Sequence, residues 1–155
     1  MNIQEIYDQA LSDPTLLSTI NIEELLENIE SETTEYLEGK TLVSISQTIR
    51  NILDSAGYFQ DINSIFDKLI GYRYVERVCE IRPGVYIRWI NPEKKRLETG
   101  GTVISVKICE KCVQVICKTV IGRHISFRFN DCIVFQKLTT EEQLILMAYE
   151  YIENV

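Results

Sequence analysis

The sequence of 155 residues has no long apolar run, and this absence argues against a protein that crosses a membrane with a helix. A membrane-spanning helix needs roughly 18 or more consecutive apolar residues, and no window approaches that length. The first five residues, Met1 to Glu5, carry neither the basic start nor the apolar stretch of a secretory signal peptide. We therefore expect an intracellular protein without a membrane partner.

The chain also lacks the motifs of common catalytic and cofactor chemistries. It has no G-x-x-x-x-G-K-[ST] loop, no G-x-G-x-x-G, no H-E-x-x-H and no G-x-S-x-G. Its one histidine, His124, has no serine or cysteine beside it in a nucleophile context, and acid–base catalysis requires a positioned second group. The paired glutamates Glu23–Glu24 and Glu141–Glu142 fall in first turns of expected helices, where the helix dipole favours negative charge. The sequence thus predicts no enzyme, no cofactor and no small-molecule substrate.

Cysteine is present in an odd number: Cys79, Cys109, Cys112, Cys117 and Cys132. Five cysteines without a signal peptide favour a reducing setting and free thiols. Cys109 and Cys112 have the spacing of a zinc knuckle, but a structural zinc site needs four ligands and no second such pair exists. A thioredoxin-type pair lies at a helix N-terminus, whereas this pair is expected at a hairpin tip. We predict no metal site, and we expect Cys117 to face the core as a small hydrophobe.

Basic residues are scarce outside one region. Residues 1–71 hold 3 Lys/Arg against 13 Asp/Glu, and residues 139–155 hold none against 4 Glu. Residues 72–138 hold 13 Lys/Arg against 6 Asp/Glu, a net charge of +7 within a chain whose total is −7. Such asymmetry indicates the kind of partner rather than the fold.

The stretch from Val85 to Phe135 predicts five short strands joined by tight turns. Apolar residues alternate with polar ones, as in half-buried strands, and glycine, proline or asparagine marks the turns. In the second strand we expect Ile104, Val106 and Ile108 to share the inward face. A leading strand is predicted ahead of these five. The predicted ranges are Tyr72–Val75, Val85–Ile90, Thr102–Ile108, Val113–Val120, His124–Phe129 and Cys132–Phe135.

Helical spacing of apolar residues dominates the rest of the chain. Asp61 is expected to cap one helix, and Thr139 with Glu142 forms a capping box for the last. Gly57 and Gly71 lie where helix-ending glycines belong. The predicted helices are Asn2–Leu11, one capped by Asn21 that extends to Ile29, Ser31–Leu37, Thr41–Ala56, Asp61–Leu69 and Thr139–Ile152.

The strand-rich region resembles SH3-like barrels of the KOW or Tudor type. The resemblance lies in Gly84 before the first strand, Gly100–Gly101 at the start of the second, and the short hairpins that follow. It implies closure into a small barrel, which removes exposed sheet edges. We therefore expect an α+β protein with three parts: an acidic helical segment (1–71), a basic SH3-like β-barrel (72–138), and a C-terminal helix (139–155) packed on the barrel.

A second resemblance concerns small uncharacterised proteins of large DNA viruses that infect algae and protists. It is carried by Tyr72–Arg77, Gly84–Ile90, Gly100–Gly101 and Phe135–Thr139. It implies a viral origin, and with it a place in the cytoplasm or nucleus of a host cell or in the virion. It implies no activity.

The basic and aromatic side chains of the expected barrel form the candidate binding surface. The first hypothesis is a contact with a partner protein or with further copies of the chain. The alternative is nucleic acid, whose phosphates such a surface can hold while aromatic rings stack on bases. A solvated face, or one neutralised by the acidic helices, would explain the same pattern. The residues are Tyr86, Arg88, Lys94, Lys95, Arg96, Lys107, Lys118, Arg123, His124 and Arg128.

Overall fold

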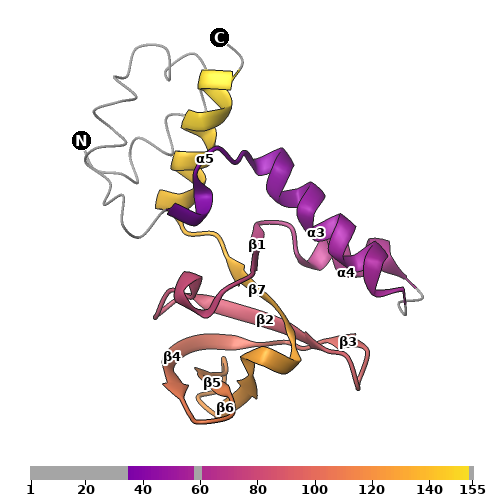
Figure 1. Cartoon of the computed structure of the whole chain (residues 1–155), viewed down its shortest axis with the longest axis vertical. Coiled ribbons are helices and arrows are strands. Elements are labelled where there is room, and N and C mark those ends of the chain that lie inside the picture. The colour runs from indigo at the N-terminus through magenta and orange to yellow at the C-terminus, as the bar shows by residue number, and fades with distance from the viewer. Residues whose placement is uncertain (1–34, 58–60, 154–155) are drawn as a thin grey trace. The chain divides into compact units, whose positions relative to one another are not determined.

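The computed structural model describes residues 35–57 and 61–153. These fall into two compact units, one within residues 1–45 and 138–155 and the other within residues 46–137. Figure 1 labels the elements of both units along the chain. The helices predicted for Asn2–Leu11 and for the segment capped by Asn21 lie outside the described residues. Of Ser31–Leu37, the described part is the 3₁₀ turn η3 (Glu35–Leu37).

The first unit contains η3 and the C-terminal helix α5 (Thr140–Glu153). The predicted capping box is confirmed: the Thr139 N–H donates to Glu142 Oε1 at 2.9 Å, and the Glu142 N–H donates to Thr139 Oγ1 at 3.1 Å. The hydroxyl of Tyr36 donates to the other carboxylate oxygen of Glu142 at 2.5 Å, which ties η3 to the start of α5. Leu37 is buried beside this bond.

Helix α3 (Leu42–Ala56) begins in the first unit and continues in the second. The Ser44 N–H donates to Thr41 Oγ1 at 3.1 Å, so Thr41 caps its start. Helix α4 (Ile62–Lys68) has the predicted Asp61 cap, which accepts from the Ser64 N–H at 3.1 Å. Both helices end before a glycine with positive φ, as predicted.

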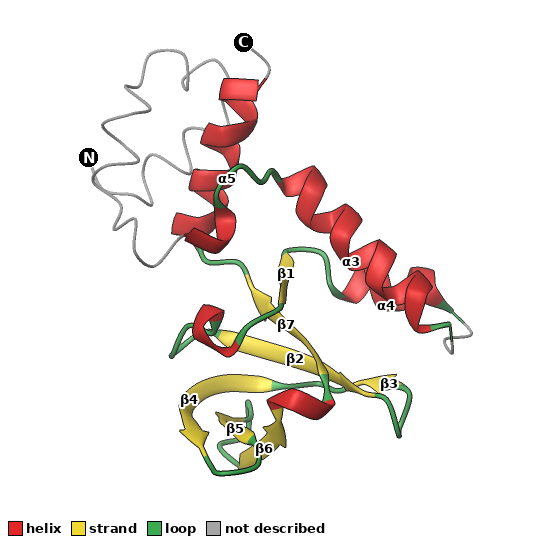
Figure 2. Cartoon of the chain, viewed as in Figure 1, coloured by secondary structure: helices red, strands yellow, loops and turns green. Residues whose placement is uncertain are grey.

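The second unit is built on a seven-stranded antiparallel sheet (Figure 2), with strand order β1-β7-β2-β4-β5-β6 and β3 paired to β2. The α+β class is therefore confirmed. Within the part of the chain that the structure describes, no pairing joins β1 to β6 to close the sheet. The strands are β1 (Tyr72–Val75), β2 (Tyr86–Asn91), β3 (Arg96–Leu97), β4 (Gly101–Ile108), β5 (Val113–Lys118), β6 (His124–Arg128) and β7 (Ile133–Lys137). Two 3₁₀ turns, η4 (Val78–Glu80) and η5 (Phe129–Asp131), precede β2 and β7.

The core of this unit has buried residues on both faces of the sheet: Ile90 and Phe135 are fully buried on one face, and a cluster around Trp89 lies on the other. Trp89 stacks on Phe127 with ring centroids 4.1 Å apart and planes 17° from parallel. Cys117 is fully buried among these residues, as predicted. The alternation of β2, β5 and β6 thus correctly identified the inward positions. The buried residues of the cluster around Trp89 are Val75, Ile81, Ile87, Trp89, Val103, Val115, Cys117, Phe127 and Val134.

The predicted inward face of β4 is wrong at one of its three residues, Ile104. Ile104 is 45% exposed, whereas Val103 is buried. The cause is a bulge: the register of β4 against β5 shifts between Val103 and Ser105, which leaves Ile104 as the extra residue. Ile108 shares the predicted face with Val106 but is 78% exposed, because it is the last residue of β4, at the hairpin tip. Val106, beyond the bulge, packs against the core as predicted.

Gly100 and Gly101 are required by close approach of the backbone at the junction of β2 and β4. A Cβ on Gly100, whose φ is +83°, would lie 2.0 Å from the Ile87 carbonyl oxygen. A Cβ on Gly101 would lie 2.7 Å from the Lys118 carbonyl oxygen. No side chain fits at either position.

A buried polar cluster joins β1, β7 and the segment that leads into β2. The Gln136 side chain accepts from the Arg82 N–H at 2.8 Å and from Arg73 Nη2 at 2.9 Å. Its amide nitrogen donates to the Arg82 carbonyl at 2.7 Å. Arg73 also donates to the Glu80 carbonyl at 2.6 Å. Since buried polar groups must be hydrogen-bonded, this cluster fixes the path of residues 80–85 along β7.

Candidate functional site

The structure brings five of the ten predicted surface residues together on the outer face of the sheet. The first cross-strand row is Tyr86–Thr102–Lys118–His124. The second is Lys107–Gln114–Arg128. Side chains at paired positions of neighbouring strands lie about 5 Å apart at Cβ and point to the same face. We call the five predicted members of these rows the basic face: Tyr86, Lys107, Lys118, His124 and Arg128.

The lysine, arginine and histidine side chains of the basic face are open to solvent. Lys107, Lys118, His124 and Arg128 are all exposed. Arg128 lies 4.0 Å from Asp131, but both side chains are about two-thirds exposed, and such surface pairs contribute little. The Tyr86 hydroxyl donates to the Thr99 carbonyl at 2.8 Å, so its ring is held in place at the end of the first row.

Arg88 has a structural position that the sequence did not indicate. It is half-buried, and its Nε donates to the Glu98 carbonyl at 3.0 Å. Burial raises the pKa of the Tyr72 hydroxyl, and the nearby Arg88 guanidinium acts in the opposite direction. Arg88 thus stabilises the connection between β2 and β4 rather than extending the basic face.

Lys94 and Lys95 belong to the turn between β2 and β3, and Arg96 is the first residue of β3. The N–H groups of Lys94 and Lys95 both donate to the Asn91 carbonyl, and Lys95 has a φ of 53°. Arg96 pairs with Glu98 at 3.2 Å. Arg123, in the turn before β6, is exposed.

A groove runs between strand β6 and residues 98–100. It consists of two adjoining cavities of about 470 and 340 Å³, which share Trp89, Glu98 and Ile125 in their walls. The larger cavity is polar and includes Lys94, Arg128 and Asp131. The smaller is mainly apolar, with Tyr86, Val120, Ile121 and Arg123 in its walls. We call the two together the β6 groove.

Sequence reasoning missed the apolar end of the β6 groove. Val120 is 87% exposed and Ile121 is 85% exposed, in the turn between β5 and β6. Two branched apolar residues at the tip of a turn were the available signal, because turns are ordinarily polar.

Strand β6 also presents a free backbone edge, since it is the last strand of the sheet among residues 35–57 and 61–153. The Thr119 N–H donates to the Arg123 carbonyl at 2.8 Å, which makes Thr119–Arg123 a bonded pair. Hydrogen-bonded and non-hydrogen-bonded residue pairs alternate along two antiparallel strands. Ile125 and Phe127 therefore direct their backbone groups to β5, and His124, Ser126 and Arg128 direct theirs to the free edge.

The cysteine pair lies at a hairpin tip, as predicted, with the Cys109 N–H donating to the Cys112 carbonyl at 2.9 Å. Burial raises the pKa of the Cys117 thiol to about 12. Burial, with Asp131 and Glu98 nearby, raises the pKa of Cys132 to about 11. Within residues 35–57 and 61–153, no three histidine, cysteine or acidic side chains gather to hold a metal ion.

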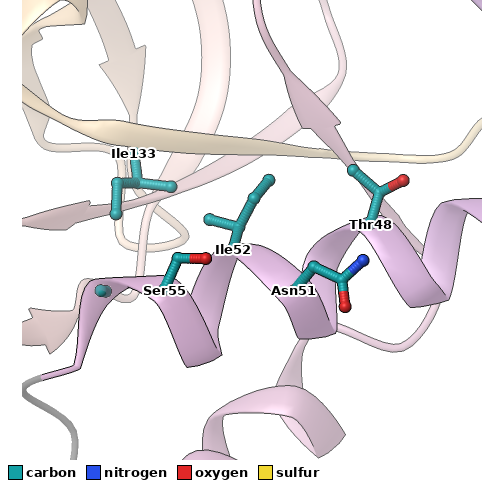
Figure 3. Close-up of a pocket in the computed structure, with 6 residues that line it drawn as sticks. Thr48, Asn51, Ile52, Ser55 and Ile133 are labelled. Carbon is teal, nitrogen blue, oxygen red and sulfur yellow. The ribbon is translucent and has the colours of Figure 1, made fainter.

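One further cavity, of about 450 Å³, lies along α3 (Figure 3). Ile52 on the helix and Ile133 on β7 form its apolar part, and Thr48, Asn51 and Ser55 add small polar groups. These side chains contain no titratable group, so the cavity offers no acid–base chemistry.

No family model, no curated protein and no solved structure matches this chain. None of the described helices has the length and apolar character needed to cross a bilayer.

Proposed function

We propose that this chain is a non-enzymatic interaction module that binds an acidic region of a partner protein, or of an assembly, through the basic face. The observation that carries the proposal is the alignment of Lys118 with His124 and of Lys107 with Arg128 in cross-strand rows. Aligned cations steer and orient an acidic partner more effectively than the same charges scattered over a surface.

The module proposed here is an SH3-like barrel. Support comes from the order of its elements: β2, β4, β5 and β6 follow one another as hairpins, and β7 returns after the 3₁₀ turn η5 to pair with β2. Strong twist of such a meander brings its edges toward each other.

Nucleic acid is the second candidate ligand for the same face. The specific observation in its favour is Tyr86, whose ring ends a row that also contains Lys118 and His124. A fixed aromatic ring beside aligned cations can stack on a base while the cations contact phosphates.

A comparison of two polyanionic probes, each titrated at several salt concentrations, separates the two candidates by which probe binds. Full-length protein is titrated with a fluorescent polyglutamate peptide and, separately, with random single- and double-stranded oligonucleotides. Neutralising several phosphates releases counterions, so oligonucleotide binding would fall steeply with salt, with a logarithmic slope of about −0.7 to −0.9 per phosphate contacted.

The proposal predicts that polyglutamate binds and that the double variant Lys118→Glu/Arg128→Glu loses at least about tenfold in affinity. Lys111→Glu is the matched control, because Lys111 is exposed at the Cys109–Cys112 hairpin tip, outside the two rows. Binding of oligonucleotides without binding of polyglutamate would favour the second candidate. Absence of binding to either probe at low salt would contradict both.

A further inference from the structure

We infer that the partner segment binds in an extended conformation and adds to the free edge of β6, with apolar side chains in the β6 groove and acidic side chains beside the basic face. This inference rests on the proposed function and specifies its ligand. It combines three observations: the free edge, the groove, and the difference between the two faces of β6.

The free edge supplies the backbone contacts. β6 ends the sheet, and His124, Ser126 and Arg128 direct their N–H and C=O groups away from β5. An extended peptide can pair with such an edge and gain main-chain hydrogen bonds at each second residue.

The two faces of β6 specify the pattern of side chains in the added strand. On the outer face, His124 and Arg128 would flank its outward residues, so acidic side chains are complementary there. On the inner face, Ile125 and Phe127 pack with the core and Trp89 lines the groove, so apolar side chains are complementary there. The expected ligand therefore alternates acidic and apolar residues.

The smaller cavity of the groove accommodates one large apolar side chain. Its volume of about 340 Å³ lies among Tyr86, Trp89 and the exposed Val120 and Ile121. These branched side chains are exposed in the free chain, and an apolar residue of the ligand would remove them from water. The wall of this cavity contains two charged residues, Arg123 and Glu98, and of these Arg123 is complementary to an acidic residue of the ligand.

The test compares peptides on the full-length protein. The first peptide alternates glutamate and valine with one central phenylalanine, and the second is polyglutamate with the same number of charges. We expect the alternating peptide to bind at least about tenfold more tightly, because only it has apolar groups to bury.

N-methylation of the alternating peptide tests for strand addition directly. In an added strand, every second amide faces β6. Methyl groups on these amides block the hydrogen bonds to β6, and methyl groups on the remaining amides point away from β6. Antiparallel addition places the glutamate amides on β6, and parallel addition places the valine amides there. We expect one set to reduce affinity at least about tenfold and the other to leave it unchanged.

Two substitutions give the same test from the side of the protein. Ile121→Ser should weaken the alternating peptide about tenfold, whereas Ile108→Ser, at a similarly exposed apolar residue outside the groove, should not. Ser126→Pro removes an N–H at the free edge and none from the ladder to β5. It should keep the fold, measured by circular dichroism, and lose the preference for the alternating peptide.

The outcomes distinguish this inference from the proposed function. If polyglutamate binds and the alternating peptide binds no tighter, or if both methylation patterns are tolerated, strand addition is overturned and the proposed function stands. If neither peptide binds, both are overturned. Increased hydrogen-exchange protection at the amides of His124, Ser126 and Arg128, but not of Ile125 and Phe127, would support the inference.

Discussion

The two halves of the sheet use their polar side chains differently. In the half formed by β1, β7 and β2, Arg73 and Gln136 are almost fully buried and bind backbone carbonyls. In the half formed by β4, β5 and β6, the side chains of Lys107, Lys118 and Arg128 are exposed in rows. These basic residues thus form two groups, one that is buried and bound to the backbone and one that is exposed to solvent.

The junction between the halves should be the most sensitive position. Gly100→Ala introduces a Cβ 2.0 Å from the Ile87 carbonyl at a φ of +83°, which the backbone can relieve only by separating β2 from β4. We expect a loss of at least about 4 kcal/mol in the free energy of unfolding, or failure to fold. Urea denaturation measures this.

Gly122→Ala is the matched control in the turn before β6. Its φ is +85°, but the nearest atom to the new Cβ is the flexible end of Lys118 at 3.8 Å. We expect a loss of about 1–2 kcal/mol, from backbone strain alone. Equal losses at the two glycines would contradict the close approach at Gly100.

A comparison of two glutamines tests the buried cluster. Gln136→Ala leaves the Arg82 N–H and the Arg82 carbonyl without their side-chain partner inside the protein. We expect a loss of about 3 kcal/mol in the free energy of unfolding. Gln114→Ala removes an exposed bond to Ser126 and should cost under about 0.5 kcal/mol. A similar cost at both positions would show that Gln136 does not fix residues 80–85.

The rate at which each cysteine reacts with a thiol reagent should decrease with the burial of its side chain. Cys109 is exposed and should react with a thiol reagent at pH 8, whereas Cys117 should react only after unfolding. Burial raises the pKa of Cys117 from 9.0 to about 12, so the folded protein binds more protons than the unfolded chain between these values. Stability should therefore decline as the pH rises above 9, and Cys117→Val should make this decline shallower. Rapid labelling of Cys117 in the folded protein would contradict its burial.

The smallest effect on stability is expected on the basic face. Lys118→Glu and Arg128→Glu change exposed side chains and should alter the free energy of unfolding by no more than about 0.5 kcal/mol each. Thermal unfolding checks this, and a larger loss would mean that these residues support the fold.

The sequence predicted the features that depend on neighbouring residues. The Thr139–Glu142 capping box, the Asp61 cap and the inward positions of β2, β5 and β6 were all correct because each follows from local chemistry. It also predicted the five residues that now form the basic face, since alternation assigns residues to faces.

The features that could not be predicted from the sequence depend on pairing between strands that are far apart in the chain. The bulge after Val103 exposes Ile104, and no local pattern distinguishes a bulged strand from a regular one. The structural position of Arg88 depends on the Glu98 carbonyl, and the buried Arg73 depends on Gln136, 63 residues away. The β6 groove could not be predicted without the strand order, because its walls come from β2, residues 98–100 and β6.

The most direct test of the basic face is a nuclear magnetic resonance titration of the full-length protein with polyglutamate. The account predicts that amide shift changes concentrate at Lys107, Lys118, His124 and Arg128, and that they disappear in Lys118→Glu/Arg128→Glu while persisting in Lys111→Glu. Shift changes centred on α3 or on β1 and β7, or no changes at low salt, would contradict it.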